Sequence, residues 1–452
     1  VRMNLDIDAQ IFIKDPQNSH KPPSTDPFKK PKRTRSLREK SRKSPGGQQG
    51  HTGHNLKHIS NPNETRIHSV YKCGRCNYPL KEIAVDQHEV RQVIDLHRGG
   101  KWIVEHKAEM KRCPRCDMMN HAGFPDEAKA YACYGPEVKR VAIYFLCYQL
   151  LPVERTRQMF EHLFNLKIGA GTFHRFCIES SLALHSWETK LQKSIINSDV
   201  VHFDETGARC NGAMTWMHVS CTDKHTLYVA HPKRGAQGLS AIGIIHEFKG
   251  TAVHDGWRPY FDFNHSGISH SLCNVHHLRE LTFIEELEKQ PWASEMKKLL
   301  RDSLHYLHER DEKKLPPKKS RIKAVGKKYD RILKRGYRTY GAPYLKDPPR
   351  PTASGQPKRD PGHNLLHRLH YYKKETLAFL QNPQVPFGNN QAERDIRMAK
   401  VKQKISGCFR SFGGAAAFCR IRSFLSTMIK QNRNPFDALT ELFPRCSCLL
   451  SA

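Results

Sequence analysis

Residues 200–209 read VVHFDETGAR, a short apolar run that ends on the carboxylates of Asp204 and Glu205. Apolar and polar residues alternate through the run, which is the period-2 pattern of a strand, and Gly207 predicts the end of that strand. A strand that finishes on Asp delivers the carboxylate to the carboxyl edge of a sheet, where ligands and metals bind in open α/β folds. The alternative is an Asp that only begins a turn.

The same pattern returns at residues 251–257, TAVHDGW, where an apolar run again ends on an acid, Asp255. Between the two runs, the spacing predicts a hairpin of strands 215–222 and 226–231, followed by a helix over 238–248. If the first and last strands are parallel neighbours, their two Asp side chains emerge side by side. Adjacent carboxylates repel each other, so the natural occupant of the gap is a hard cation with oxygen ligands, with Mg²⁺ as the default.

A third acid lies far along the chain, in the stretch NNQAER at residues 389–394. With Asn390 as the N-cap of a helix, Glu393 occupies the third helical position, which is the spacing of a capping box. The functional alternative places Glu393 on the first turn of a helix packed on the sheet, as a third metal ligand. Spacing alone leaves both interpretations open.

Three motifs together resemble the DDE transposases of the IS66 insertion-sequence family: FDET, HDGW and the long run NNQAERDIRMAKVKQKISGCFRSFGGAAAFCRIRSF. Upstream, NSHKPPSTD and GGQQGHTGHNL are similar to the N-terminal region of that family. With gaps, the resemblance covers residues 18–439. It implies an α/β fold with an RNase H-like mixed-sheet catalytic core, in which Asp204, Asp255 and Glu393 are the metal-binding triad.

The resemblance also implies a function. The protein would be a DNA transposase that cleaves at the inverted-repeat ends of its element and transfers the 3′-hydroxyl strands into target DNA. Two Mg²⁺ or Mn²⁺ ions, about 3.5–4 Å apart, would serve this phosphoryl transfer. The implied partners are double-stranded DNA, further copies of the chain and accessory proteins of the same element. Two alternatives stay open: an RNase H-fold nuclease or resolvase that cleaves without joining, and a catalytically silent zinc DNA-binding protein from a truncated element copy.

The composition of the chain agrees with a nucleic-acid partner. Its 452 residues carry 75 Lys and Arg against 44 Asp and Glu, and the net charge of +31 is typical of a polyanion-binding protein. No apolar run reaches transmembrane length, and no signal-peptide core or lipidation motif indicates a membrane. We therefore expect a cytoplasmic, nucleoid-associated bacterial protein. Its 14 cysteines would be thiols or zinc ligands in that reducing compartment.

Four of the cysteines form a paired motif, Cys73-Gly-Arg-Cys76 and Cys113-Pro-Arg-Cys116, in turns that contain Gly or Pro. Thiolates from two such turns can converge on one tetrahedral ion. The spacing therefore predicts structural Zn²⁺ in a small β-rich module over residues 59–125. Unrelated buried thiols are the alternative.

The remaining segments are expected to be mostly helical or basic. Residues 130–195 indicate a helical region, which is either a helix-turn-helix or a plain connector. Within the insertion, residues 313–360 are too basic and Pro-rich for a compact core and predict a partly flexible stretch that faces DNA. After Gly413-Gly414, a final amphipathic helix is expected on the sheet. The other boundaries are a disordered arm over 1–58, the catalytic core in two parts over 196–284 and 386–440, a basic helical insertion over 285–385, and a tail over 441–452.

Basic residues from three parts of the chain are candidates for DNA contact. The arm is a block of like charge, which commonly binds nucleic acid. The string Cys273-x2-His276 resembles one found in many DDE transposases between the second Asp and the Glu, which places it near the acids. The candidates are Lys29, Lys30, Lys32, Arg33 and Arg35 in the arm, His276 and Arg279 after the second Asp, and Arg394, Arg397, Lys400, Lys402 and Lys404 after the Glu.

Overall fold

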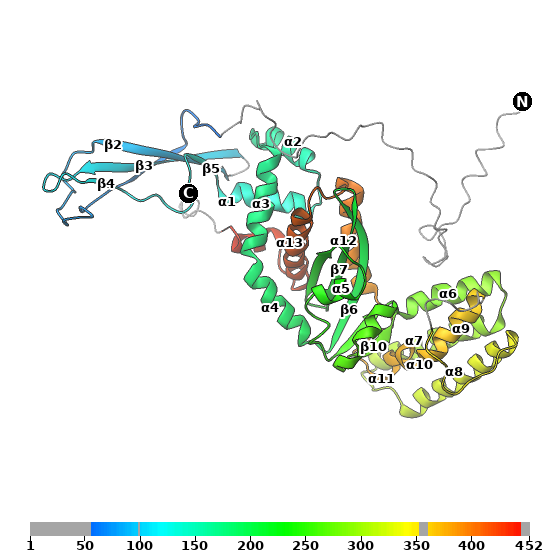
Figure 1. Ribbon diagram of the computed structural model, residues 1–452. Helices are drawn as coiled ribbons and strands as arrows, with labels where there is room; N and C mark the ends of the chain where they lie inside the picture. The colour runs from blue at the N-terminus through cyan, green and yellow to red at the C-terminus, as the bar shows by residue number, and fades with distance from the viewer. Residues whose placement is uncertain (1–55, 98–99, 352–359, 444–452) are drawn as a thin grey trace, which may run out of the picture.

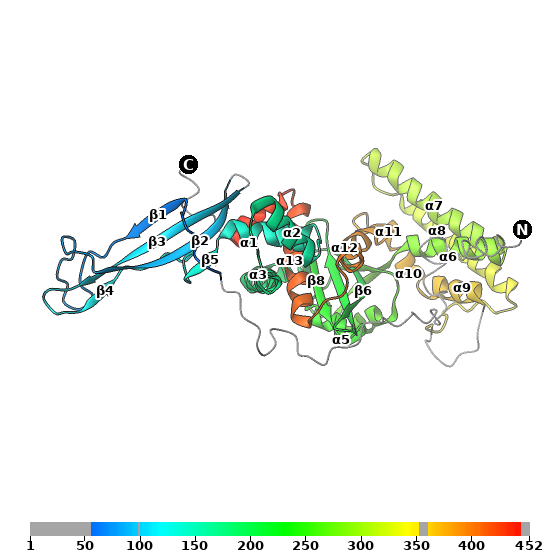
Figure 2. The ribbon, with the colours of Figure 1, turned by 90° about the horizontal axis from the view of Figure 1, so that it is seen from above.

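The computed structural model describes residues 56–97, 100–351 and 360–443 (Figure 1). The molecule is elongated, with a β-rich module at one end, a helical insertion at the other and a second sheet with its helices between them (Figures 1 and 2). The arm with Lys29, Lys30, Lys32, Arg33 and Arg35 lies outside the described residues. In the part of the chain that is described, no helix is long and apolar enough to cross a membrane.

The β-rich module is built around one long antiparallel pair, β2 and β3, in which β2 is paired over its whole length. The first Cys turn precedes β2 and the second follows β3, so the pairing brings both turns to one end. The strands are β1 (Glu64–His68), β2 (Gln87–His97), β3 (Gly100–Arg112), β4 (Met119–His121) and β5 (Ala132–Tyr134), in the order β1-β3-β2-β5 with β4 on β3.

A helical region connects this module to the second sheet. Its helices are α1 (Pro136–Ile143), which continues as the π-helical turn η2 (Tyr144–Tyr148), then α2 (Val153–Phe164), α3 (Ala170–Ala183) and α4 (His185–Ile196). Phe173 and Phe176 of α3 are buried with Phe160 of α2 in a core shared with the C-terminal helices. One face of α3 is therefore held by the protein interior.

Asp95, near the end of β2, joins the module to α1. Its carboxylate accepts hydrogen bonds from the N–H groups of Glu137 at 3.3 Å and Val138 at 2.9 Å, in the first turn of α1. Burial nevertheless raises the pKa of Asp95 to about 6. The folded state thus holds this proton more tightly than the unfolded chain, so stability from this group is fully present below about pH 4 and is lost as the pH rises through about 6.

We expect Asp95→Asn to remove this pH dependence, because the amide is uncharged and keeps an acceptor for Val138. Between pH 4 and pH 7, the free energy of unfolding measured by urea denaturation should fall by roughly 3 kcal/mol more in the wild type than in the variant. Asp86→Asn, at an exposed acid of the same module, is the control and should follow the wild-type profile. Parallel profiles for wild type and Asp95→Asn would contradict the raised pKa.

The second sheet has five strands in the order β10-β9-β6-β7-β8. Strands β6, β7 and β8 form an antiparallel meander, and β9 and β10 run parallel to β6. The predicted hairpin and the predicted parallel pairing of the two Asp-bearing strands are confirmed. The elements are β6 (Val200–Cys210), β7 (Ala213–Cys221), β8 (Thr226–His231), α5 (Ala236–Ala241), β9 (Thr251–His254), η3 (Arg258–Ser266) and β10 (Ser269–Leu272).

Two local predictions for this sheet were wrong. The first strand does not end at Gly207, because pairing with β7 continues to Cys210. The chain reverses at Asn211-Gly212, where φ is positive at both residues, 47° and 78°, as a tight hairpin turn requires. The helix expected over 238–248 is limited to α5, because Gly243 follows it with a φ of 74°.

Helices α12 (Asn390–Ser406) and α13 (Phe412–Lys430) cover one face of this sheet. The predicted amphipathic helix is α13, although Gly413-Gly414 form its first turn, where Ser411 accepts the Gly414 N–H, and do not break the chain. The edge strand β8 is closed by hydroxyls of this helix, because Tyr228 N–H donates to Ser423 Oγ. Such covering leaves no open sheet edge on that side. Two short helical segments follow, α14 (Pro435–Ala438) and η4 (Leu439–Glu441).

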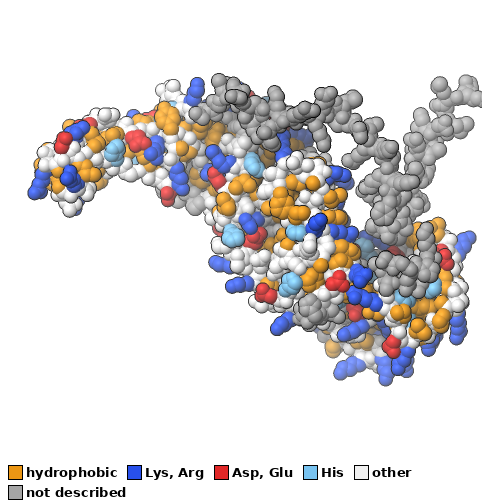
Figure 3. Space-filling view, viewed as in Figure 1, with side chains coloured by type: hydrophobic (Ala, Val, Ile, Leu, Met, Phe, Trp, Pro, Cys, Tyr) orange, Lys and Arg blue, Asp and Glu red, His pale blue; other side chains and the backbone are white. Residues whose placement is uncertain are grey.

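The insertion is a helical bundle with its own core, which corrects the expectation for residues 313–360. Tyr329, Ile332 and Leu333 of α8 are fully buried, because apolar residues fall on one face of the helix while its Lys and Arg fall on the other. Lys and Arg side chains gather over this end of the molecule (Figure 3). The helices are α6 (Asn274–Leu287), α7 (Pro291–Glu312), α8 (Lys319–Thr339), α9 (Pro361–Tyr371), α10 (Lys373–Thr376) and α11 (Ala378–Gln381).

Candidate active site

Asp204 and Asp255 lie at neighbouring positions because the strands that lead to them, β6 and β9, are parallel neighbours. The last pair in the parallel register of the two strands is His202 with Val253. Asp204 and Asp255 each lie two residues after that pair, so they occupy matching positions. Burial raises the pKa of Asp204 well above its usual range, and the charges of Glu205, Asp255 and Glu393 raise it further. The predicted acids therefore share one electrostatic environment.

The turn after β9 fixes the backbone around Asp255. Gly256 has a φ of 90°, a conformation that favours Gly. The Asp255 carboxylate is exposed and accepts the N–H of Trp257 at 2.9 Å. The sequence HDGW thus folds as a tight turn that presents one acid to solvent beside the more buried Asp204.

Glu205 has a different role from its neighbour. Successive side chains of a strand point to opposite faces, and Glu205 is held there by Arg234, at 2.7 and 3.0 Å, and by the hydroxyl of Tyr260, at 2.6 Å. Arg234 also lies over the rings of Trp216 and Trp257, at 4.9 and 4.2 Å from their centroids. We interpret Glu205 as a buried partner of Arg234, a contact that no local motif in the sequence indicates.

Glu393 lies on the first turn of α12, and the capping box, one of the two interpretations left open by the spacing, does not form. The helix begins one residue earlier than predicted, with Asn389 as its N-cap and without a side-chain cap. Glu393 instead faces α6, with Oε1 3.6 Å from His276 Nδ1 and Oε2 3.8 Å from the guanidinium of Arg279. Cys273 Sγ is 3.9 Å from Oε1. The structure thus gathers the Cys273-x2-His276 string and Arg279 around the third acid.

Asn389 connects this helix start to the strand that carries Asp204. Its side-chain N–H donates to Phe203 O at 2.7 Å, its Oδ1 accepts from His202 Nδ1 at 2.9 Å, and its backbone N–H donates to Cys273 Sγ at 3.1 Å. The residue is 2 % exposed. Because these contacts reach β6 directly before Asp204, Asn389 sets the position of α12 relative to that acid.

We expect Asn389→Ala to destabilise the protein by about 2–4 kcal/mol, because it leaves the buried Phe203 carbonyl and the His202 ring without partners. Thermal unfolding followed by circular dichroism measures this loss. The matched control is Asn390→Ala, which changes the adjacent but exposed residue and should stay within about 0.5 kcal/mol of wild type. Equal stability of the two variants would show that the buried amide contributes nothing.

The basic residues of α12 divide between two faces. Arg397, Lys400 and Lys404 are exposed and follow Glu393 at intervals of four, three and four residues, so they share its face of the helix. Arg394, next to that row, is also exposed. Lys402 is on the opposite face, over the Phe418 ring at 6.0 Å, and burial lowers its pKa. Lys402 therefore does not share the helix face of the other basic residues predicted to contact DNA.

The donor chemistry of the acids fits a hard cation. Asp204, Asp255 and Glu393 offer carboxylate oxygens. The pKa of Asp204 is raised first by burial and then by neighbouring negative charges, and a divalent ion would neutralise those charges. The three carboxylates are not among the groups of described residues whose ligand atoms all lie within 4.8 Å of one another. Oxygens on one Mg²⁺ lie within about 4.2 Å, twice its bond length. The three carboxylates therefore do not converge on one point in this structure.

The four predicted zinc ligands do form such a group. Cys73 Sγ lies 3.5 Å from Cys116 Sγ, and Cys76 Sγ lies 3.6 Å from Cys113 Sγ. A tetrahedral Zn²⁺ with bonds of about 2.3 Å requires separations of about 3.8 Å. The Cys76 N–H lowers the pKa of Cys73 to about 6, while burial and the neighbouring thiols raise the pKa of Cys116 to about 12. The cluster could therefore hold one structural ion.

The two Cys turns have the same backbone geometry. The carbonyl of Cys73 accepts the N–H of Asn77 at 3.0 Å, and that of Cys113 accepts the N–H of Asp117 at 2.9 Å. Asn77 and Asp117 both have positive φ values, 56° and 59°, a conformation that Asn and Asp tolerate better than most residues. The repeat of one turn in two places matches a pair of metal-binding knuckles.

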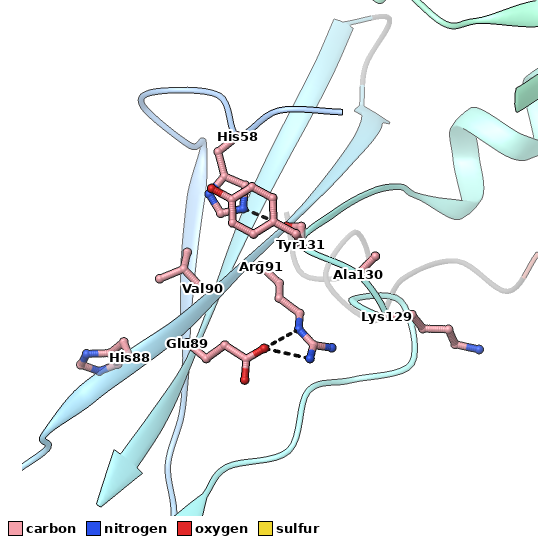
Figure 4. Close-up of a pocket in the computed structure, with 8 residues that line it drawn as sticks. All are labelled: His58, His88, Glu89, Val90, Arg91, Lys129, Ala130 and Tyr131. Atoms are coloured by element: carbon pink, nitrogen blue, oxygen red, sulfur yellow. Dashed lines mark hydrogen bonds and ion pairs between the residues drawn. The ribbon is translucent and has the colours of Figure 1, made fainter. Parts of the chain in front are cut away.

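A hollow of about 690 Å³ lies on the β-rich module, away from the acids. His58 stacks on Tyr131 there with ring centroids 3.6 Å apart, and Arg91 turns toward Glu89, while Lys129 points away (Figure 4). The ion pair between Arg91 and Glu89 joins two residues that both line the hollow, and the lining residues include no cluster of acids. We therefore locate the candidate active site at the second sheet.

The second sheet lies within the part of the chain that matches a known protein family. A family model described as "Transposase IS66 family" matches residues 132–417, which include both Asp-bearing strands, the insertion and Glu393. A second model, described as a family of unknown function (DUF6444), matches residues 6–57. A search of curated proteins found no match.

Proposed function

Because this chain belongs to the IS66 transposase family, we propose that it is a DDE transposase that cleaves at the ends of its insertion sequence and joins the 3′-hydroxyl strands to target DNA. The observation that supports this most directly is the parallel pairing of β6 and β9, which brings Asp204 and Asp255 together. Glu393 is the proposed third acid, since its charge also acts on Asp204.

We further propose that the second sheet and its helices form an RNase H-like core. The support is a mixed sheet of five strands, with an antiparallel meander followed by two parallel strands. Helices cover both faces of the sheet, with α12 and α13 on one and α5 on the other. The basic insertion leaves this core after β10 and returns to it at α12.

In the proposed mechanism, Asp204, Asp255 and Glu393 hold two Mg²⁺ or Mn²⁺ ions. When bound, such ions activate the attacking hydroxyl and stabilise the leaving oxygen in phosphoryl transfer. The row of Arg397, Lys400 and Lys404, together with Arg394, holds the phosphates of double-stranded DNA beside the acids, where direct charge contacts fix the register of the backbone.

His276 and Arg279 complete the polar surroundings of Glu393. The chemistry needs no Ser or Tyr nucleophile, because the three carboxylates would hold the ions and form no covalent bond to DNA. We also propose that the protein works as a homo-oligomer on DNA, helped by accessory proteins of the same element, within the bacterial nucleoid.

The experiment that tests this function is strand transfer in vitro with the full chain, Mg²⁺ and labelled duplexes that carry pre-cleaved element ends. Joining of the label to a target plasmid is the expected result. Cleavage without joining would favour an RNase H-fold nuclease, and tight DNA binding without any chemistry would favour a catalytically silent protein. Both outcomes would overturn the proposal.

A further inference from the structure

A second cluster of ligand-type side chains lies between α6 and α12. Cys273, His276 and Glu393 place one sulfur, one ring nitrogen and one carboxylate oxygen within 4.8 Å of one another. Cys273 is the N-cap of α6, His276 is on the first turn of that helix and Glu393 is on the first turn of α12. The cluster is separate from the four Cys residues of the β-rich module.

The three side chains face one another without forming good hydrogen bonds. His276 Nδ1 is shielded from solvent and has no hydrogen-bond partner, because Glu393 Oε1 at 3.6 Å is too distant. Cys273 Sγ accepts the N–H of Asn389 at 3.1 Å. A buried ring nitrogen without a partner is costly. Burial raises the pKa of Cys273 to about 11, although the N–H of Asn389 favours the thiolate, so the sulfur gives up its proton when a cation takes the place of that proton. All three groups thus have unused capacity to bind a cation.

We propose that Cys273 Sγ, His276 Nδ1 and Glu393 Oε1 form a second site for a borderline-soft divalent ion of the Zn²⁺ class. Ligand pairs on a tetrahedral Zn²⁺ lie about 3.4–3.6 Å apart. The separations of 3.6 Å between His276 and Glu393 and 3.9 Å between Cys273 and Glu393 need to close by only a few tenths of an ångström. A thiolate and an imidazole favour such an ion over Mg²⁺, which prefers oxygen ligands.

Occupancy of this site has a consequence for Glu393. The ion engages Oε1 on the α6 side, while Cys273 releases its thiol proton to solvent. Glu393 is then shared between two sites, and a Zn²⁺-class ion draws it away from Asp204 and Asp255. This consequence rests on the proposed function, whereas binding of the ion does not. Until this ion leaves, the proposed catalytic site would therefore lack Glu393 as its third acid.

The test is a Co²⁺ titration of the full chain, without DNA or Mg²⁺, after the four-Cys site has been loaded with Zn²⁺. Co²⁺ substitutes for Zn²⁺ and reports a thiolate ligand by a near-ultraviolet charge-transfer band. We expect one additional Co²⁺ per chain with this band. The band should be absent in Cys273→Ser, and affinity should fall at least about tenfold in His276→Ala. Cys408→Ser, at an exposed cysteine outside both clusters, should match wild type.

No Co²⁺ uptake beyond the loaded site, or a thiolate band that survives in both variants, would overturn the proposal. His276→Ala keeps every cysteine and removes a partly exposed ring, so it tests the site even if Cys273→Ser fails to fold. Zinc content measured alongside shows whether Co²⁺ has replaced ions in the four-Cys cluster. Strand transfer is scored separately: its failure with the Co²⁺ site intact refutes the proposed function, and its success without Co²⁺ uptake refutes only the second site.

Discussion

Replacing Asp204 with Asn is expected to reduce strand transfer by about a thousandfold or more, which corresponds to roughly 4 kcal/mol of lost transition-state stabilisation. The amide keeps the shape of the side chain but binds a hard cation poorly. Asp204 is more buried than Asp255 and feels the charges of both Asp255 and Glu393. Its loss therefore removes the carboxylate that is coupled to both of the others. Rates of joining with pre-cleaved element ends measure the effect.

The same substitution should leave folding intact and slightly favour it. The charged form of Asp204 is destabilised by burial and by its acidic neighbours, so an uncharged amide relieves repulsion in the absence of metal. Asp255→Asn and Glu393→Gln should lose joining as well. Asp223→Asn, an exposed acid in the turn between β7 and β8, is the control and should join normally. Retention of joining by Asp204→Asn would mean that this acid is no metal ligand.

The position of the two Asp residues could be predicted from the sequence because it depends on short-range patterns. Each lies at or near the end of an apolar run, and parallel pairing of those runs is enough to bring them together. The length of β6 could not be predicted in the same way. Gly207 reads as a turn in isolation, but it remains in the strand because β7 provides partners beyond it.

The role of the third acid, in contrast, could not be predicted from the local sequence. Capping-box spacing around Glu393 is a local signal, and it suggested a role that the fold does not use. The competing contacts come from residues far apart in sequence, with Asn389 bonded to Phe203 and to Cys273. Only the family resemblance assigned Glu393 to the acids. Arg234, which supports Glu205, had no signal at all, since a lone Arg in a loop has no periodicity.

The helical character of the insertion was predicted correctly, but its compact core was missed because composition was given more weight than periodicity. High charge and several Pro residues indicate disorder when averaged over residues 313–360. Within α8, however, Val325, Tyr329 and Ile332 are spaced by four and three residues and are buried. One apolar stripe is sufficient to pack a helix, whatever charge its outer face carries.

Cys113→Ser is expected to abolish metal binding at the four-Cys cluster and to unfold the end of the β-rich module. The buried apolar core of that end consists of Cys73, Leu80 and Cys113, which is too small to offset the entropy of ordering two turns. A structural Zn²⁺ supplies on the order of 10 kcal/mol of apparent binding free energy to small metal-dependent folds. The metal, and not hydrophobic burial, should therefore hold this end together.

The unfolding should be local, because the other end of the same sheet has a different support. Ile94, Leu96 and Ile103 belong to the large core shared with α1 and α13. Hydrogen exchange should therefore lose protection at backbone bonds such as Cys113 N–H to Met118 O, while protection in the second sheet persists. A chelator that removes Zn²⁺ should reproduce the pattern in the wild type.

Cys133→Ser is the matched control, because it removes a thiol of the same module outside the cluster. Its Sγ donates to Glu127 O at 2.9 Å, a bond that a Ser hydroxyl can form, so zinc content and exchange should stay at wild-type levels. If instead the end of the module stayed protected in Cys113→Ser, the four cysteines would be ordinary buried thiols. In that case, hydrogen bonds within the turns, and not a metal ion, would have to explain why the two turns have the same geometry at Asn77 and Asp117.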